Sequence, residues 1–198
     1  MLIEEKRQIM TFKRLWQSFR LLTIRGSAAR TEYIRKRHVY GAIGENCTIQ
    51  KRKVPLYANL IRLGNNVHIA SNVSFLTHDV THLVLNNLDT VIERGGVQEK
   101  IGCIEIGDNV FIGSGTHILY GTKIGSNVII GTCSVVTHDI PDNSIVVGAP
   151  ARVIGSFDSY LEKRLSQNEY PAELKPRRQT VSDELAEYMW EKFEKKHS

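Results

Sequence analysis

The sequence predicts a mainly β fold, a parallel β-helix with one extruded loop and with helices at both ends. Two observations predict it. An aliphatic residue recurs at every sixth position from Ile106 to Val136, and a small or β-branched residue follows each one four positions later. A period of six fits neither a helix nor the alternation of a hairpin strand, and it is typical of a solenoid whose short strands turn and stack. The aliphatic positions are Ile106, Ile112, Ile118, Ile124, Ile130 and Val136, and their small or branched companions are Val110, Thr116, Thr122, Val128, Ser134 and Ile140.

The same pattern begins earlier in the chain, with interruptions. Ile43 and Leu63 are 20 residues apart, which is one coil of three hexads with a two-residue insertion. Phe75 and Ile106 are 31 residues apart, which leaves a loop of about 25 residues near 77–101. Loops of this length in a compact domain are usually functional, so we expect the chemistry to lie close to this one.

Three parts are expected in the chain: an N-terminal helical segment over 1–40, a β-helix domain over 41–155, and a C-terminal helical extension over 156–198. Apolar residues at i, i+3/i+4 spacing predict the first helix, and Ser182 followed by two acidic residues predicts the start of the last one. The expected helices cover 4–24, 28–37, 156–167 and 182–196.

The composition narrows the class of protein. No apolar run approaches the ~20 residues of a spanning helix, and no signal-peptide pattern opens the chain, so a cytoplasmic protein is expected. The three cysteines, Cys47, Cys103 and Cys133, match no zinc spacing. They suit a reducing compartment, and we expect all three to be small core residues.

The net charge of +5 is confined to the N-terminal part. Residues 1–38 hold ten Lys/Arg and three Asp/Glu, whereas the rest of the chain is nearly balanced. This distribution does not favour nucleic-acid binding by the β-helix. We expect the first helix to pack on the solenoid with a solvated basic face. Because Lys13, Trp16, Phe19 and Arg20 interleave, peripheral docking on an anionic membrane or a charged glycan stays open.

The hexads, together with the closing segment VTHDIPDNSIVVGAPARVI over 136–154, resemble the hexapeptide-repeat acyltransferases. The sequence is similar to the maltose and galactoside O-acetyltransferases and to polysaccharide O-acetyltransferases, over roughly residues 28–155. The resemblance implies a left-handed β-helix, a homotrimer with active sites between subunits, and acetyl-CoA as co-substrate with no metal required.

On the strength of this resemblance, His78 at the base of the loop is expected to be the general base. A histidine titrates near neutral pH and can take a proton from a sugar hydroxyl as that hydroxyl attacks a thioester. Its orienting partner stays open among Asp79, Glu93 and Glu99. We expect acceptor contacts from Asp79 and His82. Weaker polar candidates are Tyr57, Asn59 and Asn87.

The resemblance also implies a groove for the acyl-CoA along the later coils. A backbone N–H near Ser114 would meet the thioester oxyanion, and Arg152 would meet the phosphates of the coenzyme. His138 stands where the family often has lysine, which makes a fixed charge there doubtful. The expected cofactor-binding residues are Gly113, Ser114, Thr132, Thr137, His138 and Arg152.

The leading function is therefore acetylation of a sugar or polysaccharide hydroxyl. N-acetylation of an aminosugar is the alternative, although residues 1–40 show no glycine-rich nucleotide-binding pattern. A γ-type carbonic anhydrase would use His78, His82 and His117, but the further histidine it needs is replaced by Thr122. A non-catalytic scaffold is a third class, which the intact His78 and closing segment disfavour.

Overall fold

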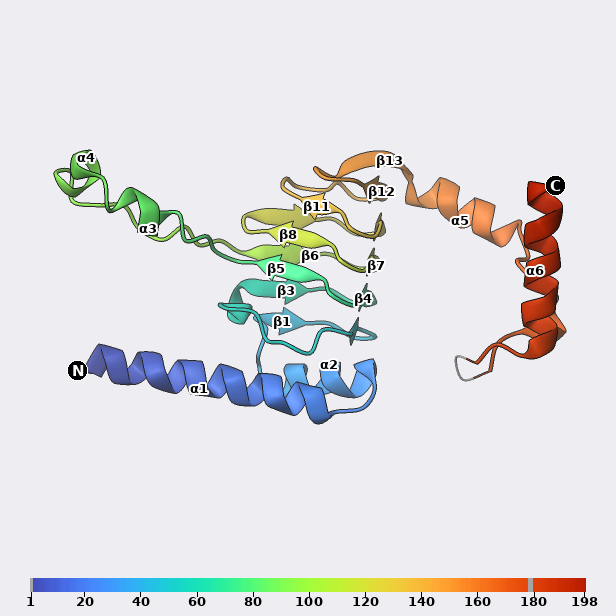
Figure 1. Ribbon diagram of the computed structural model, residues 1–198, viewed down its shortest axis with the longest axis horizontal. Helices are drawn as coiled ribbons and strands as arrows, with labels where there is room; N and C mark the ends of the chain where they lie inside the picture. The colour runs from blue at the N-terminus through green and yellow to red at the C-terminus, as the bar shows by residue number, and fades with distance from the viewer. Residues whose placement is uncertain (1, 178–179) are drawn as a thin grey trace. The chain divides into compact units, whose positions relative to one another are not determined.

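Three sheets, parallel except for the last strand of the second, stack coil upon coil to form a β-helix (Figure 1). The computed structural model describes residues 2–177 and 180–198, with side chains from residue 12 onward. The first sheet has the order β1 (Ala42–Ile43), β3 (Ile61–Leu63), β6 (Ile104–Ile106) and β9 (Thr122–Ile124). The second sheet has the order β2 (Thr48–Ile49), β4 (Val67–Ile69), β7 (Val110–Ile112), β10 (Val128–Ile130), β12 (Ser144–Val147) and β13 (Arg152–Ser156). The third sheet has the order β5 (Ser74–Leu76), β8 (His117–Leu119) and β11 (Val135–Val136).

The strand register confirms the spacing predicted from sequence. Val110 pairs with Val128 one regular coil later, and Ile43 pairs with Leu63 across the coil that has the insertion. Ile61 pairs with Ile104, which lies 43 residues on and so differs from a regular 18-residue coil by 25. The extruded loop therefore has the length that the hexad count predicted.

The predicted inward positions form the core. All six aliphatic residues and all six small or branched residues of the hexads are buried. The buried hydroxyls are satisfied within the coil, because Thr116 and Ser134 both donate to the Gly131 carbonyl and Thr122 donates to the Leu119 carbonyl. Burying a hydroxyl without a partner would cost about 1–3 kcal/mol, so these bonds explain how polar residues fit in the prism.

Asparagines form a column at one corner of the β-helix. Asn66, Asn109 and Asn127 all have positive φ, near 55°, a conformation that asparagine tolerates better than most residues. Their side chains bond one another in sequence, from Asn66 to Asn109 at 3.0 Å and from Asn109 to Asn127 at 2.8 Å. The column fixes the turn and the stacking at once.

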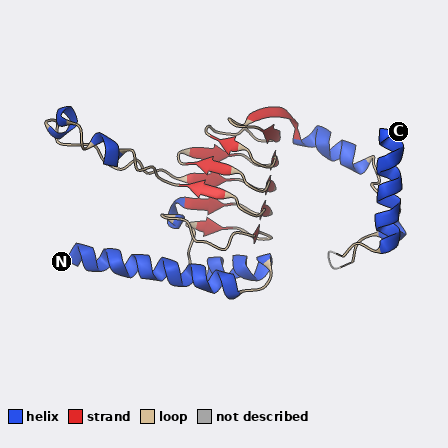
Figure 2. Cartoon of the chain, viewed as in Figure 1, coloured by secondary structure: helices blue, strands red, loops and turns tan. Residues whose placement is uncertain are grey.

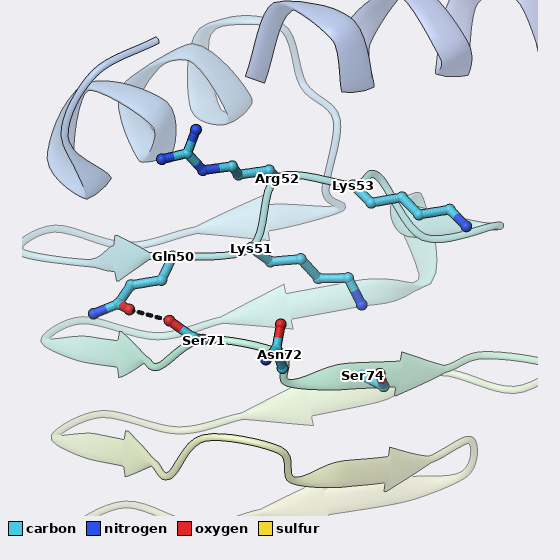
Figure 3. Close-up of a pocket in the computed structure, with 7 residues that line it drawn as sticks. All are labelled: Gln50, Lys51, Arg52, Lys53, Ser71, Asn72 and Ser74. Atoms are coloured by element: carbon cyan, nitrogen blue, oxygen red, sulfur yellow. Dashed lines mark hydrogen bonds between the residues drawn. The ribbon is translucent and has the colours of Figure 1, made fainter. Parts of the chain in front are cut away.

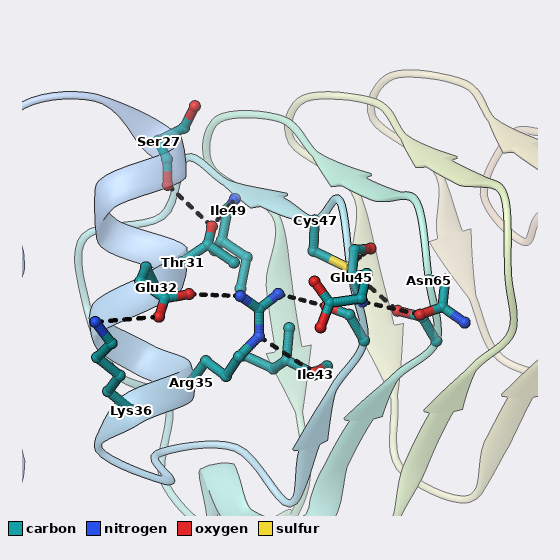
Figure 4. Close-up of polar contacts among 12 residues, drawn as sticks. Ser27, Thr31, Glu32, Arg35, Lys36, Ile43, Glu45, Cys47, Ile49 and Asn65 are labelled. Carbon is teal, nitrogen blue, oxygen red and sulfur yellow. Dashed lines mark hydrogen bonds and ion pairs between the residues drawn. The ribbon is translucent and has the colours of Figure 1, made fainter.

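Two helices precede the β-helix: α1 (Leu2–Thr23) and α2 (Ser27–Lys36). Helix α2 packs against the first coil and covers the open end of the β-helix (Figure 4). The buried Thr31 hydroxyl accepts a hydrogen bond from the Ile49 amide at 2.8 Å, and the Arg35 guanidinium donates to the Gly44 and Ile43 carbonyls. These bonds satisfy backbone groups at a coil edge that has no preceding coil.

The apolar stripe of the first helix does not pack on the solenoid as expected. Leu21 is buried, whereas Phe12 is 71% exposed and the other members of the stripe whose side chains are described are also exposed. Trp16 and Phe19 stack on each other with ring centroids 5.8 Å apart instead of on the core. Among the described side chains, Ser18 in the C-terminal part of the helix contacts the β-helix, where its hydroxyl accepts from the Val54 amide. The other exposed members of the stripe are Leu15, Trp16, Phe19 and Leu22.

The prediction for the cysteines was also wrong for two of three. Cys47 is buried in the first coil, but Cys103 and Cys133 are exposed. Cys133 has φ 56° at a corner, where its side chain points away from the prism. The burial of Cys133 is therefore decided by its position in the hexad and not by its residue type.

The extruded loop contains two short helices, α3 (His82–Leu85) and α4 (Asp89–Ile92), which the sequence had not predicted. The Asn86 side chain closes the loop by bonding the backbone of Val97 in both directions. The loop aliphatics Leu83, Val84, Leu85 and Leu88 are exposed in the single chain.

Residues from Asp158 onward form a second compact unit. It is mainly helical (Figure 2), with most of α5 (Phe157–Leu165), the short 3₁₀ helix η2 (Ala172–Leu174) and α6 (Asp183–His197). Ser182 caps α6 by accepting from the Leu185 amide, as its position before two acidic residues predicted. Within the described residues, none of the helices combines the length and the apolar character that crossing a membrane requires.

Candidate active site

Two extended segments meet where the loop leaves the β-helix, and they hold His78 between them. The Gly102 amide donates to the Thr77 carbonyl and the Asp79 amide donates to the Lys100 carbonyl, both at 3.0 Å. His78 and Ile101 are therefore directly opposite each other in an antiparallel bridge. Thr77 is buried, and its hydroxyl donates to the Leu56 carbonyl at 2.7 Å. The backbone of His78 is thus fixed although the loop beyond it is long.

The His78 ring lies against Tyr57. The two rings meet edge to face, with centroids 5.3 Å apart, and the Tyr57 hydroxyl donates to the Glu99 carboxylate at 3.0 Å. Within the described residues, the buried Nδ1 of His78 has no hydrogen-bond partner. None of the three predicted orienting carboxylates, those of Asp79, Glu93 and Glu99, therefore bonds this nitrogen in the single chain. The Tyr57 ring packs against the imidazole instead.

Asp79 is held by its own turn and by a neighbouring coil. Its Oδ1 accepts from the Thr81 hydroxyl at 2.6 Å and from the Thr81 amide at 3.1 Å, and its Oδ2 accepts from the Tyr120 hydroxyl at 2.5 Å. These hydrogen bonds, from Thr81 first and then from Tyr120, lower the pKa of Asp79 to about 2. The hydrogen bond between Tyr120 and Asp79 also raises the pKa of Tyr120. The Lys100 ammonium lies 5.2 Å from the centre of the Tyr120 ring.

The other predicted acceptor residues lie around this loop base. His82 begins α3, and its half-buried ring also has a buried Nδ1 with no partner in the described part of the chain. Asn59 is exposed in the short 3₁₀ helix η1 (Ala58–Leu60), which follows Tyr57 directly. Asn87 is exposed in the loop, and its side chain donates to the Leu83 carbonyl.

The predicted cofactor residues divide between two corners of the β-helix. Gly113 and Ser114 follow β7 and Thr132 follows β10, so these three lie at the corner between the second and third sheets. Thr137 and His138 follow β11, so they lie at the corner where the third sheet leads back to the first, as does His78 after β5. A single chain therefore does not bring the two sets together.

The first of these corners is tightly stacked. A Cβ added at Gly113 would lie 2.6 Å from the Thr132 backbone nitrogen in the next coil, so only glycine fits at this position. Ser114 and Thr132 are exposed on the outer side of the stack, and the Cys133 amide donates to the Ser114 carbonyl at 2.8 Å.

The second corner and the closing segment carry the remaining candidates. The Thr137 hydroxyl and His138 Nδ1 are 2.8 Å apart, and both residues face outward. Arg152 is exposed at the start of β13, where its guanidinium donates to the Ala151 carbonyl. Antiparallel pairing of β13 with β12 covers the end of the second sheet and fixes the position of Arg152.

Sequence reasoning missed the bond of Tyr120 to Asp79 and the position of Lys100 beside the Tyr120 ring. A signal was present, since Tyr120 is an aromatic residue placed just after a strand where other coils have small or polar corner residues. The described residues contain no group of three or more His, Cys, Asp or Glu side chains arranged to hold a metal ion, and this includes His78, His82 and His117.

The comparisons with known proteins agree with the repeat pattern. The family described as "Bacterial transferase hexapeptide (six repeats)" matches residues 103–138. The galactoside O-acetyltransferase of Lactococcus lactis subsp. lactis (strain IL1403) is 33% identical over 160 residues, which cover 70% of this chain and 73% of that protein. The matched part of this chain spans only 49%, 63% and 57% of the full lengths of three further relatives.

Solved structures with the same fold cover more of the chain. A maltose O-acetyltransferase from Clostridium difficile 630 is similar with a TM-score of 0.52 and 26% identity, over 75% of this chain and 88% of that one. A galactoside acetyltransferase in complex with coenzyme A has a TM-score of 0.53 and 23% identity, over 81% and 85%, a likeness that shows the fold alone. The β-helix is accordingly of the left-handed hexapeptide type. By its repeats, its fold and its relatives, the chain belongs to the hexapeptide-repeat acetyltransferases.

Proposed function

We propose that this acetyltransferase moves the acetyl group of acetyl-CoA onto a hydroxyl of a saccharide, with His78 as general base. The observation that carries the proposal is the position of His78, which the bridge to Ile101 and the Tyr57 ring hold at the base of the extruded loop. The names of the O-acetyltransferase relatives support an acceptor of the sugar class and a hydroxyl as the acceptor group.

The proposed step is a direct transfer. The acceptor hydroxyl oxygen attacks the thioester carbonyl carbon while His78 takes the hydroxyl proton. The carbon–sulfur bond then breaks, the thiolate leaves and takes up the proton, and the products are an acetyl ester and coenzyme A. A positioned base of this kind typically contributes about 10²–10⁴-fold to the rate. A backbone N–H near Ser114 would stabilise the oxyanion, as the family resemblance implies.

The division of the cofactor residues between two corners supports an active site shared by subunits. We infer a homotrimer in which the Gly113, Ser114 and Thr132 corner of one subunit faces the His78 corner of its neighbour. The exposed aliphatics of the loop would be covered in such an assembly, which reduces the cost of exposing them to water. The side chains of Thr137, His138 and Arg152 would then be available to the coenzyme.

The decisive measurement is coenzyme A release with a panel of saccharides. A His78→Ala variant should lose at least about 10²-fold in kcat with an unchanged melting temperature, whereas Glu93→Gln on the exposed part of the loop should match the wild type. Equal rates for His78→Ala and wild type would overturn the mechanism. Acetylation confined to amino groups of aminosugars would favour the N-acetyltransferase alternative.

Mixed trimers test the shared site. His78→Ala and Thr132→Trp chains, each inactive alone, should recover about a quarter of the wild-type sites when co-expressed, because a cyclic trimer then contains some intact pairs of corners. No recovery in a protein that sediments as a trimer would place both corners in one subunit.

A further inference from the structure

A basic groove lies on the early coils, at the corner between the second and third sheets. Its volume is about 450 Å³. A segment that leaves the first coil after β2 supplies one wall, and the turn before β5 in the next coil supplies the other (Figure 3). The groove is lined by Gln50, Lys51, Arg52, Lys53, Ser71, Asn72 and Ser74.

The groove has three cations and no carboxylate in its lining. Within the described part of the chain, none of Lys51, Arg52 and Lys53 forms an ion pair. Lys51 and Arg52 donate only to backbone carbonyls, those of Val73 at 2.9 Å and Leu22 at 3.2 Å. Carbonyls hold these side chains in place without neutralising their charge.

A fourth cation, Arg30, interacts electrostatically with Arg52 of the groove. Arg30 in α2 is only 5% exposed, and its Nε is buried without a hydrogen-bond partner within the described residues. Burial, and then the charge of Arg52, lower the pKa of Arg30. Burial, and then the charge of Lys53, lower the pKa of Lys51 as well. The cluster is therefore electrostatically unfavourable by itself, and an anion in the groove would relieve it.

We propose that this groove binds a phosphate group carried by the acetyl acceptor, so that the acceptor is a phosphorylated saccharide. The inference rests on the proposed function and names its substrate class. A phosphate monoester carries about two negative charges and three acceptor oxygens, which match the Lys51 ammonium and the Ser71, Asn72 and Ser74 side chains, while Arg52 and Lys53 add positive charge at the same wall (Figure 3).

Strand β5 connects the groove to the proposed base. Val73, Phe75 and Thr77 are buried, so Ser74, Leu76 and His78 lie on the outer side by the alternation of an extended chain. Ser74 lines the groove at one end, and His78 lies four residues on, a span of at most about 14 Å. A saccharide whose phosphate occupies the groove would extend along β5 toward His78.

The test compares galactose 1-phosphate with galactose by isothermal titration, using the full chain. Galactose 1-phosphate should bind at least about tenfold more tightly, and its affinity should fall as sodium chloride is raised. The double variant Lys51→Gln/Lys53→Gln should lose at least about tenfold of that affinity. The matched control is Lys123→Gln, which removes an exposed cation that pairs with Glu105 on the first sheet. Lys53→Gln alone keeps the test valid if loss of the Lys51 bond to Val73 lowers the melting temperature.

Several outcomes would overturn the proposal. One is equal affinity for the two sugars, and another is binding that the double variant does not weaken. Binding to phosphatidylglycerol vesicles but not to galactose 1-phosphate would assign the groove to a lipid headgroup instead. A rise in KM for acetyl-CoA with no change in KM for the phosphorylated acceptor would assign it to the coenzyme.

The two proposals fail separately. His78→Ala should lower the rate of transfer by at least about 10²-fold and leave the binding of galactose 1-phosphate intact. If galactose 1-phosphate does not bind at the groove but transfer to galactose still depends on His78, the phosphate-binding proposal alone is rejected. If the groove binds phosphate but the His78→Ala variant transfers the acetyl group at the wild-type rate, the general-base mechanism alone is rejected.

Discussion

The Tyr120 hydroxyl donates to the Asp79 carboxylate at 2.5 Å, joining residues 41 apart in the sequence. Tyr120 follows β8 in the third sheet, and Asp79 follows His78 at the start of the loop. The bond therefore ties the loop base to the coil that comes after the loop. It restricts movement of the backbone on which the proposed general base is carried.

Replacing Tyr120 with Phe should release this tie while preserving the ring. Without the hydroxyl, the pKa of Asp79 should rise from about 2 toward its ordinary value of 3.8. We expect kcat/KM to fall by about tenfold, because a displaced base is less well aligned with its substrate. A carboxyl titration by NMR and steady-state kinetics measure the two effects. Tyr160→Phe, on an exposed helix of the second unit, is the control, and an unchanged Asp79 titration in Tyr120→Phe would contradict the assignment.

The stability that Asp79 contributes should depend on pH in a definite direction. Its folded-state pKa is below the ordinary value, so the contribution is fully present above about pH 4 and is lost as the pH falls toward 2. The difference in melting temperature between wild type and Asp79→Asn should be constant from pH 5 to 8 and shrink below pH 4. A difference that grows on acidification would show that the carboxylate is not the stabilised form.

Tyr57 and Glu99 should affect the proposed base through packing rather than through a proton. Tyr57→Phe and Glu99→Gln keep the ring against His78, and each should lower kcat by less than about tenfold. Tyr57→Ala removes the ring and should lower kcat by about 10²-fold at an unchanged melting temperature. A kcat in Tyr57→Ala within about tenfold of the wild type would show that the ring does not orient His78.

Gly113 should be intolerant of even one added carbon. Its Cβ would lie 2.6 Å from a backbone nitrogen of the next coil, and overpacking of this kind typically costs about 1–3 kcal/mol. Nothing lies within 4 Å of a Cβ at Gly155, so Gly155→Ala should change the free energy of unfolding by less than about 0.5 kcal/mol. Urea denaturation of both variants measures the contrast. Equal stabilities would mean that the stack relaxes at no cost.

Predictions from residue type failed where position mattered more. The apolar stripe of α1 predicted a packing face, yet among its described side chains Leu21 is buried while Phe12, Leu15, Trp16, Phe19 and Leu22 are exposed. Cys133 lies at an outward-facing corner position of the hexad repeat, so its apolar character did not bury it. Amphipathic spacing predicts that a face exists but not what covers it.

The sequence by itself determined the coil, its core and the point at which the loop leaves. Each coil must place an aliphatic side chain at the same level of the stack, so the period and its interruptions specify the register. The count located the base of the loop, and the family resemblance selected His78 there. Tertiary structure alone decided the contacts of Tyr57 with His78, of Tyr120 with Asp79 and of Lys51 with the turn before β5. These contacts join residues from different coils or from insertions, and a repeat period carries no information on how an insertion folds back. The site therefore depends on stacking between coils, while the fold depends on the pattern within each one.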